Sequence, residues 1–104
     1  MIFVALDEAA RKGELILVEG GMCRFHLRRD GVVVVREILV LPPHRRRGIG
    51  RKMLSAVMRI HPDAKVIVKC PAKYHDGNAF WYAMGFHQLD SKDGINLWER
   101  LPCA

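Results

Sequence analysis

The residues best suited to chemistry lie in one basic, glycine-containing segment, residues 44–52, in which five of nine residues are Arg or Lys. It follows an apolar run that ends in Pro42-Pro43 and precedes apolar residues at helical spacing. The first amides of a helix lack backbone partners and lie at the positive end of its dipole, so a bound anion satisfies several donors. Gly48 and Gly50 allow close approach, and arginines add forked donors. This segment predicts a phosphate-binding loop.

Other interpretations of the segment stay open at this point. The Gly48-x-Gly50 pair would need a third small residue in place of Met53 to match a dinucleotide fingerprint, and there is no Gly-Lys-Ser/Thr. A solvated basic turn is one alternative. A nucleic-acid or acidic-protein binding module that contacts phosphates nonspecifically is another, and the net charge of +6 (17 Lys+Arg minus 11 Asp+Glu) agrees with any anionic partner. The aromatic residues lie mainly elsewhere, which disfavours a base-stacking surface.

The 104 residues, half of them apolar, fit one domain over residues 1–104. Cys23, Cys70 and Cys103 are odd in number and far apart, a pattern that indicates neither a disulfide framework nor a zinc site. The apolar opening run is too short for a signal peptide, and no run approaches the ~20 apolar residues of a membrane span. We therefore expect a cytoplasmic protein with no metal and no membrane partner.

Periodicity predicts the elements that position the basic segment. A helix over residues 48–60, followed by an apolar run at 66–68 typical of a strand covered on both faces, predicts a β-α-β unit with parallel strands. Before it we expect a strand at residues 2–6, one or two helical turns at 7–12 ended by Gly13, and an antiparallel meander of strands at 14–19, 22–29 and 32–41. After it we expect a loop at 71–77, a helix at 79–84 capped by Asn78 and ended by Gly85, and a hairpin of strands at 86–89 and 95–101. The order predicts an α+β fold with a twisted mixed sheet of about six to seven strands.

Two motifs within this order resemble a known family. Residues 38–50, ILVLPPHRRRGIG, resemble the signature of the GCN5-related N-acetyltransferases (GNAT), a strand ending in Val and Pro that leads into Arg/Gln-x-x-Gly-x-Gly/Ala; Arg45, Gly48 and Gly50 occupy its fixed positions. Residues 78–86, NAFWYAMGF, resemble the later Asn-x-x-x-Tyr-x-x-x-Gly-Phe stretch. The likeness covers roughly residues 32–86. It implies a GNAT-like sheet with a splayed parallel pair and, here, a shortened N-terminal helical region.

The resemblance implies that acetyl-CoA is a co-substrate bound where the strands at 32–41 and 65–70 splay apart. The backbone of Leu39 and Val40 would pair with the pantetheine arm. The pyrophosphate would lie on the amides of Arg45, Arg46, Arg47, Gly48, Ile49 and Gly50. Arg51 and Lys52 are further candidates for phosphate contact, with solvated charge on a helix face as the alternative. Asn78, at the start of the second helix, and Trp81 complete the expected cofactor-binding set.

The family's chemistry is direct attack of an amine on the thioester. The resemblance makes Glu37 the candidate base and the Val40 amide the oxyanion donor. The alternative for Glu37 is an ion pair with Arg36 or Arg28.

Two departures from the family pattern affect function. Trp81 stands where the family commonly has the tyrosine that protonates the thiolate; an indole cannot do so, and we expect Tyr82 to be packed and water to supply the proton. A relative that binds coenzyme A without catalysis is therefore an alternative. His75 is a further candidate for substrate contact. The short N-terminal region predicts an open acceptor site, for a macromolecular amine (a protein terminus, a lysine or an RNA-bound amine) or for completion by a second subunit in a homodimer.

Overall fold

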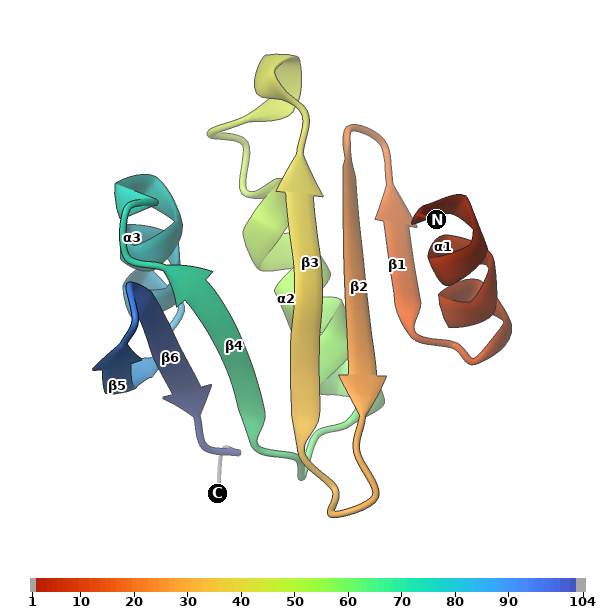
Figure 1. The fold of residues 1–104 in the computed structure, drawn as a ribbon. Helices are drawn as coiled ribbons and strands as arrows, with labels where there is room; N and C mark the ends of the chain where they lie inside the picture. The colour runs from red at the N-terminus through yellow and green to blue at the C-terminus, as the bar shows by residue number, and fades with distance from the viewer. Residues whose placement is uncertain (1, 103–104) are drawn as a thin grey trace.

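The computed structural model describes residues 2–102. It contains one mixed sheet with helices packed around it (Figure 1). The helical segments are α1 (Ile2–Arg11), the 3-10 turn η1 (Pro42–His44), α2 (Ile49–Ile60) and α3 (His75–Ala83). The strands are β1 (Leu15–Val18), β2 (Gly21–Leu27), β3 (Val33–Val40), β4 (Val66–Pro71), β5 (His87–Lys92) and β6 (Ile95–Arg100). Their order is β1-β2-β3-β4-β6-β5. Among the paired strands of residues 2–102, β3 with β4 is the one parallel pair, as the β-α-β unit predicted.

The predicted strand at residues 2–6 is wrong, because these residues form the start of α1. A short apolar run does not distinguish strand from helix, and the residues after it decide. Two alanines, strong helix formers, follow the run, and Asp7 and Arg11 form an i,i+4 ion pair with a 2.5 Å N···O distance. The helix stops before Gly13, as predicted, where φ is +70°. The sheet accordingly has six strands in the described range.

The core lies between the sheet and α2, which runs behind β2 and β3 in Figure 1. Met53, Leu54 and Val57 of α2 are fully buried, at the spacing that places them on one helix face. They belong to one cluster with the inward side chains of the sheet, Cys23, Phe25, Val33, Val35, Val66, Val68, Cys70 and Trp98. The opposite face near β4 is less covered: Ile67 is half-buried and Lys69 exposed. The expectation that residues 66–68 are covered on both faces is therefore wrong.

A β-bulge in β3 separates two halves of the strand. Phe25 of β2 pairs with Val35, but the next residue back, Arg24, pairs with Glu37, so Arg36 is the extra residue. The bulge shifts the alternation: Val35 faces the core before it, and Ile38 and Val40 pack against the core after it. The parallel pairing of β3 with β4 ends at the same point, with Val35↔Val68 as its last pair. Beyond the bulge the two strands diverge, which agrees with the splayed parallel pair expected from the sequence.

The helix after β4 begins earlier than predicted. Asn78 is not its N-cap, because α3 starts at His75 and the Asn78 backbone N–H donates to the Tyr74 carbonyl over 2.9 Å inside the first turn. The end is as predicted, just before Gly85, where φ is +85°.

Within residues 2–102 no helix combines the length and apolar character needed to cross a bilayer.

Candidate functional site

The loop between β3 and α2 presents a row of backbone donors. Gly48, the N-cap of α2, has φ +74° and ψ 16°, and Arg46 also has a left-handed φ of +64°. No side chain caps the helix, and none of its first residues is acidic. In the described part of the chain, no protein atom accepts a hydrogen bond from the backbone N–H groups of residues 46–51, whereas the Arg45 N–H donates to the Pro42 carbonyl over 3.3 Å. The loop can therefore offer six amides to an external anion.

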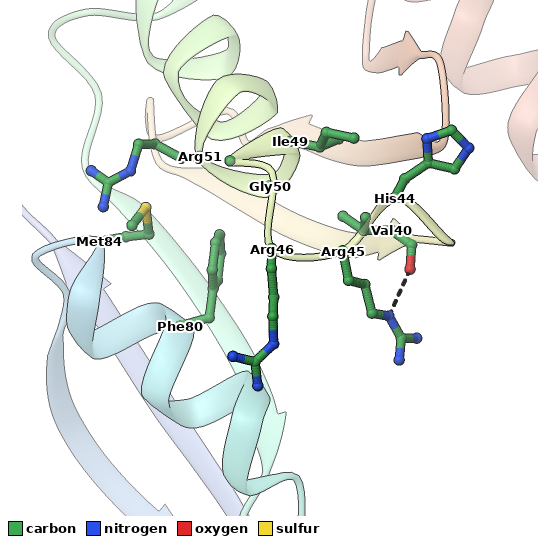
Figure 2. Close-up of a pocket in the computed structure, with 10 residues that line it drawn as sticks. Val40, His44, Arg45, Arg46, Ile49, Gly50, Arg51, Phe80 and Met84 are labelled. Atoms are coloured by element: carbon green, nitrogen blue, oxygen red, sulfur yellow. Dashed lines mark hydrogen bonds between the residues drawn. The ribbon is translucent and has the colours of Figure 1, made fainter. Parts of the chain in front are cut away.

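Two adjoining cavities lie along this loop. The first, about 290 Å³, is bounded by the start of α2 and by α3, with Arg46, Gly48, Arg51 and Met84 in its wall. The second, about 470 Å³, continues along the divergent end of β3 toward Trp81. Both are lined by the same five residues, Val40, Arg45, Arg46, Gly50 and Phe80. Figure 2 shows the Arg46 side chain extended from the loop toward α3, beside the Phe80 ring. Together the cavities form a path from the donor loop to the space between the divergent end of β3 and the first turns of α3.

Gly50 allows α2 to approach α3 closely. A Cβ atom at this position would lie 2.9 Å from Cε1 of Phe80, so a side chain there requires the ring to move. Phe80 is also in edge-to-face contact with Trp81, whose ring centroid is 5.0 Å away. A larger residue at position 50 would thus disturb the wall shared by both cavities.

The backbone of β3 turns polar groups toward the gap. The Leu41 N–H donates to the carbonyl of Gly20, the residue before β2. Because successive N–H groups of a strand point to opposite sides, the Val40 N–H points away from β2, toward β4. The Val40 carbonyl faces the same way and accepts a 3.0 Å hydrogen bond from Arg45 Nε (Figure 2). By the same alternation the backbone N–H and carbonyl of Ile38 face the gap. The backbone groups of Leu39 face β2, and Leu39 contributes only to the cavity lining.

The candidate base Glu37 follows the bulge on the face away from α2. Its Oε1 accepts a 2.5 Å hydrogen bond from Arg24 Nη2. The sequence anticipated an arginine partner as an alternative, but named Arg36 or Arg28; strand register places Arg24 directly opposite Glu37 instead. The Glu37 side chain is 38% exposed, and the second carboxylate oxygen has no partner among residues 2–102. Glu37 is therefore open to water and to a second substrate.

Asn78 joins α3 to the sheet. Its side-chain amide donates to the carbonyls of Pro71 and Tyr74 over 3.0 and 2.8 Å. Its oxygen accepts from Asn96 Nδ2 over 3.0 Å and from Trp98 Nε1 over 2.8 Å. Both donors belong to buried residues of β6. The amide thus holds the first turn of α3 against β4 and β6.

Trp81 is 3% exposed and packs edge-to-face against Phe86. It borders the larger cavity. Burial raises the pKa of the neighbouring Cys70 thiol, and the Trp81 indole opposes this shift only in part. Tyr82 is 75% exposed, so the expectation that it is packed is wrong; on the helix it lies about 100° from buried Trp81. Arg47 and His75 are exposed and do not line the two cavities.

Several residues of the site escaped the sequence analysis, among them Asp76 and Gly77 in the wall of the larger cavity. Phe80 and Met84 are four residues apart on α3, and their shared face could have been recognised from that spacing. Ile38 depends on the bulge, and Arg24 on the β2–β3 register; neither leaves a signal in the sequence. No group of His, Cys, Asp or Glu in the described range is arranged to hold a metal ion.

Comparisons with solved structures support this architecture. A GNAT acetyltransferase from Bacillus cereus superposes with a TM-score of 0.78 at 15% identity, over 96% of this chain and 78% of that one. The ribosomal-protein-S18-alanine N-acetyltransferase of Escherichia coli gives 0.68 at 17% identity, over 82% and 63%. YncA of Salmonella typhimurium, a putative acetyltransferase solved with its cofactor acetyl-CoA, gives 0.62 at 20% identity, over 82% and 59%. The chain thus spans less than two thirds of the last two proteins.

No curated protein matches the chain significantly in sequence. The family described as the acetyltransferase (GNAT) domain matches residues 1–88, most of the 104. With the bulged, splayed strand pair and the loop that follows it, this match establishes that the chain belongs to the GNAT acetyltransferase domain family.

Proposed function

We propose that this chain is an N-acetyltransferase that moves an acetyl group from acetyl-CoA directly to an amine. The observation that carries the proposal is the divergence of β3 and β4 after Val35↔Val68, with a 470 Å³ cavity between the divergent end of β3 and α3 and a 290 Å³ cavity continuing to the donor loop. An elongated substrate with a diphosphate near one end and a thioester at the other matches this path. The family membership and the acetyl-CoA in the Salmonella protein support the same substrate.

The two ends of acetyl-CoA would meet different groups. The amides of residues 46–51 would hold the diphosphate, with Arg46 and Arg51 adding charge-assisted hydrogen bonds. The Ile38 N–H would pair with the pantetheine arm, the Val40 N–H would face the thioester oxygen at the end of that arm, and Phe80 would pack against it. The full proposed set keeps Leu39, Val40, Arg45, Arg46, Arg47, Gly48, Ile49, Gly50, Arg51, Asn78 and Trp81 and adds Ile38 and Phe80. Within it Asn78 acts by positioning α3, since its amide is fully engaged.

In the proposed reaction Glu37 removes a proton from the amine, through water, and the nitrogen attacks the thioester carbon. The C–N bond forms, negative charge develops on the carbonyl oxygen, and the Val40 N–H stabilises it. The C–S bond then breaks and coenzyme A leaves as a thiolate. Because the indole of Trp81 cannot donate its proton and Tyr82 points to solvent, water protonates the thiolate.

The acceptor in this proposal is an amine on a macromolecule. On the face of the sheet that carries Glu37, α1 packs mainly on β1 and β2 and reaches β3 only beside Arg36, so the described residues leave much of β3 and β4 open there. An open surface of this kind admits a large substrate. The name of the Escherichia coli neighbour indicates that a protein amine is an acceptor of that enzyme, which supports this class.

Acetyl-CoA binding and turnover test the proposal together. At a hundredfold excess over Kd, acetyl-CoA should stabilise the protein by about 2.7 kcal/mol, which raises the melting temperature by roughly 10–20 °C. Absence of any stabilisation would refute the proposal. Turnover is measured as release of free thiol in the presence of amine acceptors.

Glu37→Gln tests the base, with Glu99→Gln as its matched control. Glu99 also lies on a strand and pairs with a cation, Lys65, at 3.5 Å, but its strand is β6, which β4 separates from β3. We expect Glu37→Gln to lower kcat by about 10²- to 10⁴-fold and to flatten its pH dependence. Glu99→Gln should leave both unchanged. Equal turnover by the two variants across pH would show that Glu37 is not the base.

A second candidate function is coenzyme A binding without catalysis, which the absence of a tyrosine hydroxyl from the cavity wall favours. Thermal stabilisation by acetyl-CoA together with no thiol release from any amine class would select this candidate.

A further inference from the structure

Two cations flank the point where β3 and β4 diverge, on the sheet face opposite α2. Val35 and Val68 form the last parallel pair, and the next residues along the two strands are Arg36 and Lys69. Both side chains are exposed. Throughout residues 2–102 neither has an ion-pair partner, whereas Arg24, Arg28 and Lys65 nearby are paired.

A shallow groove of about 360 Å³ joins these cations. Val34 and Ile67, which pair across the two strands, form its apolar floor. Arg36, Lys69 and Arg28 form its walls. Among residues 2–102 no carboxylate lines the groove itself. Asp30 pairs with Arg28, Glu37 with Arg24 and Glu99 with Lys65, and Asp90 lies on the edge strand β5. Glu8 of α1 and Glu14 lie with Arg36 in an adjoining pocket, where Glu14 bonds to His26. The lining of the groove therefore carries a net positive charge.

The position of the groove relates it to the acceptor. Gly50, Phe80 and Trp81 of α2 and α3 wall the proposed acetyl-CoA site on the other face of the sheet. A second substrate consequently reaches the gap from the open face, past Arg36 and Lys69, with Glu37 next to Arg36 in the chain.

The charge of the groove discriminates among amines. A small cationic amine is repelled by two unpaired cations, whereas an amine carried beside carboxylates is attracted. Nearby cations also favour the uncharged amine, which is the form that attacks. The charge is thus compatible with the reaction only if the acceptor brings its own negative groups.

We propose that the acceptor is an extended acidic peptide segment that lies in this groove, with carboxylates paired to Arg36 and Lys69. The inference rests on the proposed acetyltransferase function. A peptide fits better than RNA because the floor is aliphatic, no aromatic side chain lines the groove for base stacking, and only two unpaired cations are available for phosphates.

Peptide binding, measured by fluorescence anisotropy, tests the inference without any need for turnover. The probes are equal-length peptides in which the residues flanking the acceptor lysine are Glu, Gln or Lys, together with a single-stranded RNA. We expect the Glu peptide to bind roughly tenfold more tightly than the Gln peptide at low salt, and the difference to shrink above 0.1 M, where the Debye length falls to about 10 Å.

Charge reversal assigns the effect to the groove. The double variant Arg36→Glu/Lys69→Glu should reverse the order of the Glu and Lys peptides. Arg59→Glu, which changes an exposed cation at the end of α2, should leave the order unchanged. Equal binding of the Glu and Gln peptides, an unaltered order in the double variant, or tighter binding of RNA would each overturn the inference.

Parallel titration with acetyl-CoA separates this inference from the proposed function. Normal acetyl-CoA binding and acetylation of the Gln peptide, with no preference for the Glu peptide, would reject only the acidic acceptor. Failure to bind acetyl-CoA would reject the proposed function, while the peptide affinities would still decide whether the groove selects acidic segments.

Discussion

Replacement of Gly48 by alanine isolates the role of the loop conformation in acetyl-CoA binding. Gly48 has φ +74°, and a Cβ atom there would meet no atom within 4 Å, so the change adds backbone strain without a clash. Gly31 is a matched control, with φ +85°, equally open space and a place in the β2–β3 turn away from both cavities. A left-handed conformation costs an L-residue about 1–2 kcal/mol.

The two variants should express this strain differently. The turn at Gly31 is held by strand pairing and by the hydrogen bond from its N–H to the Arg28 carbonyl, so Gly31→Ala should lose about 1–2 kcal/mol of stability. The loop at Gly48 has free amides on both sides and can relax, so Gly48→Ala should lose less stability. Binding of acetyl-CoA must then restore the strained conformation, which lowers affinity by about 5- to 30-fold.

Urea denaturation and calorimetric titration with acetyl-CoA measure both quantities for each variant. The expected pattern is a loss of stability with unchanged affinity for Gly31→Ala, and a loss of affinity with a smaller loss of stability for Gly48→Ala. If Gly48→Ala lost as much stability as Gly31→Ala and bound acetyl-CoA normally, the protein itself would be holding the loop, and the reasoning would be refuted.

Three further changes have defined outcomes. Arg46→Gly removes the left-handed strain at φ +64° together with the guanidinium, so urea denaturation should show equal or higher stability while titration shows roughly tenfold or more weaker acetyl-CoA binding; unchanged binding would remove Arg46 from the site. Asn78→Ala leaves the buried Trp98 indole N–H without its acceptor and should lower stability by about 2 kcal/mol or more; a smaller change would mean that water replaces the amide. The Arg28 hydrogen bond holds the pKa of the Asp30 carboxyl below its usual 3.8, so this carboxylate stabilises the fold above that pH and the contribution disappears as the pH falls below it. Asp30→Asn should therefore be less stable than the parent at pH 7, with the difference shrinking toward pH 3; a constant difference would contradict the ion-pair account.

The sequence by itself determined the central unit and the loop. The spacing of Met53, Leu54 and Val57 can bury only one helix face, and the turn at Asp30-Gly31 can connect only neighbouring strands, so periodicity predicted β2, β3, α2 and β4 in order. The basic Gly-x-Gly segment predicted the donor loop because its chemistry is local: helix-start amides and adjacent arginines need no distant partner.

Tertiary structure alone decided what depends on pairing between distant segments. The run at residues 2–6 was compatible with strand or helix, and the helix is the form observed. The extra residue at Arg36 sets the positions whose backbone N–H groups face the gap, Ile38 and Val40. The β2–β3 register places Arg24 opposite Glu37 as its partner. The parallel pairing ends at the same point as the bulge, so Arg36 and Lys69 are the first residues beyond the last pair. These contacts join residues far apart in the chain, so no local pattern records them; they are set by the cross-strand register, which one added residue changes for every position that follows.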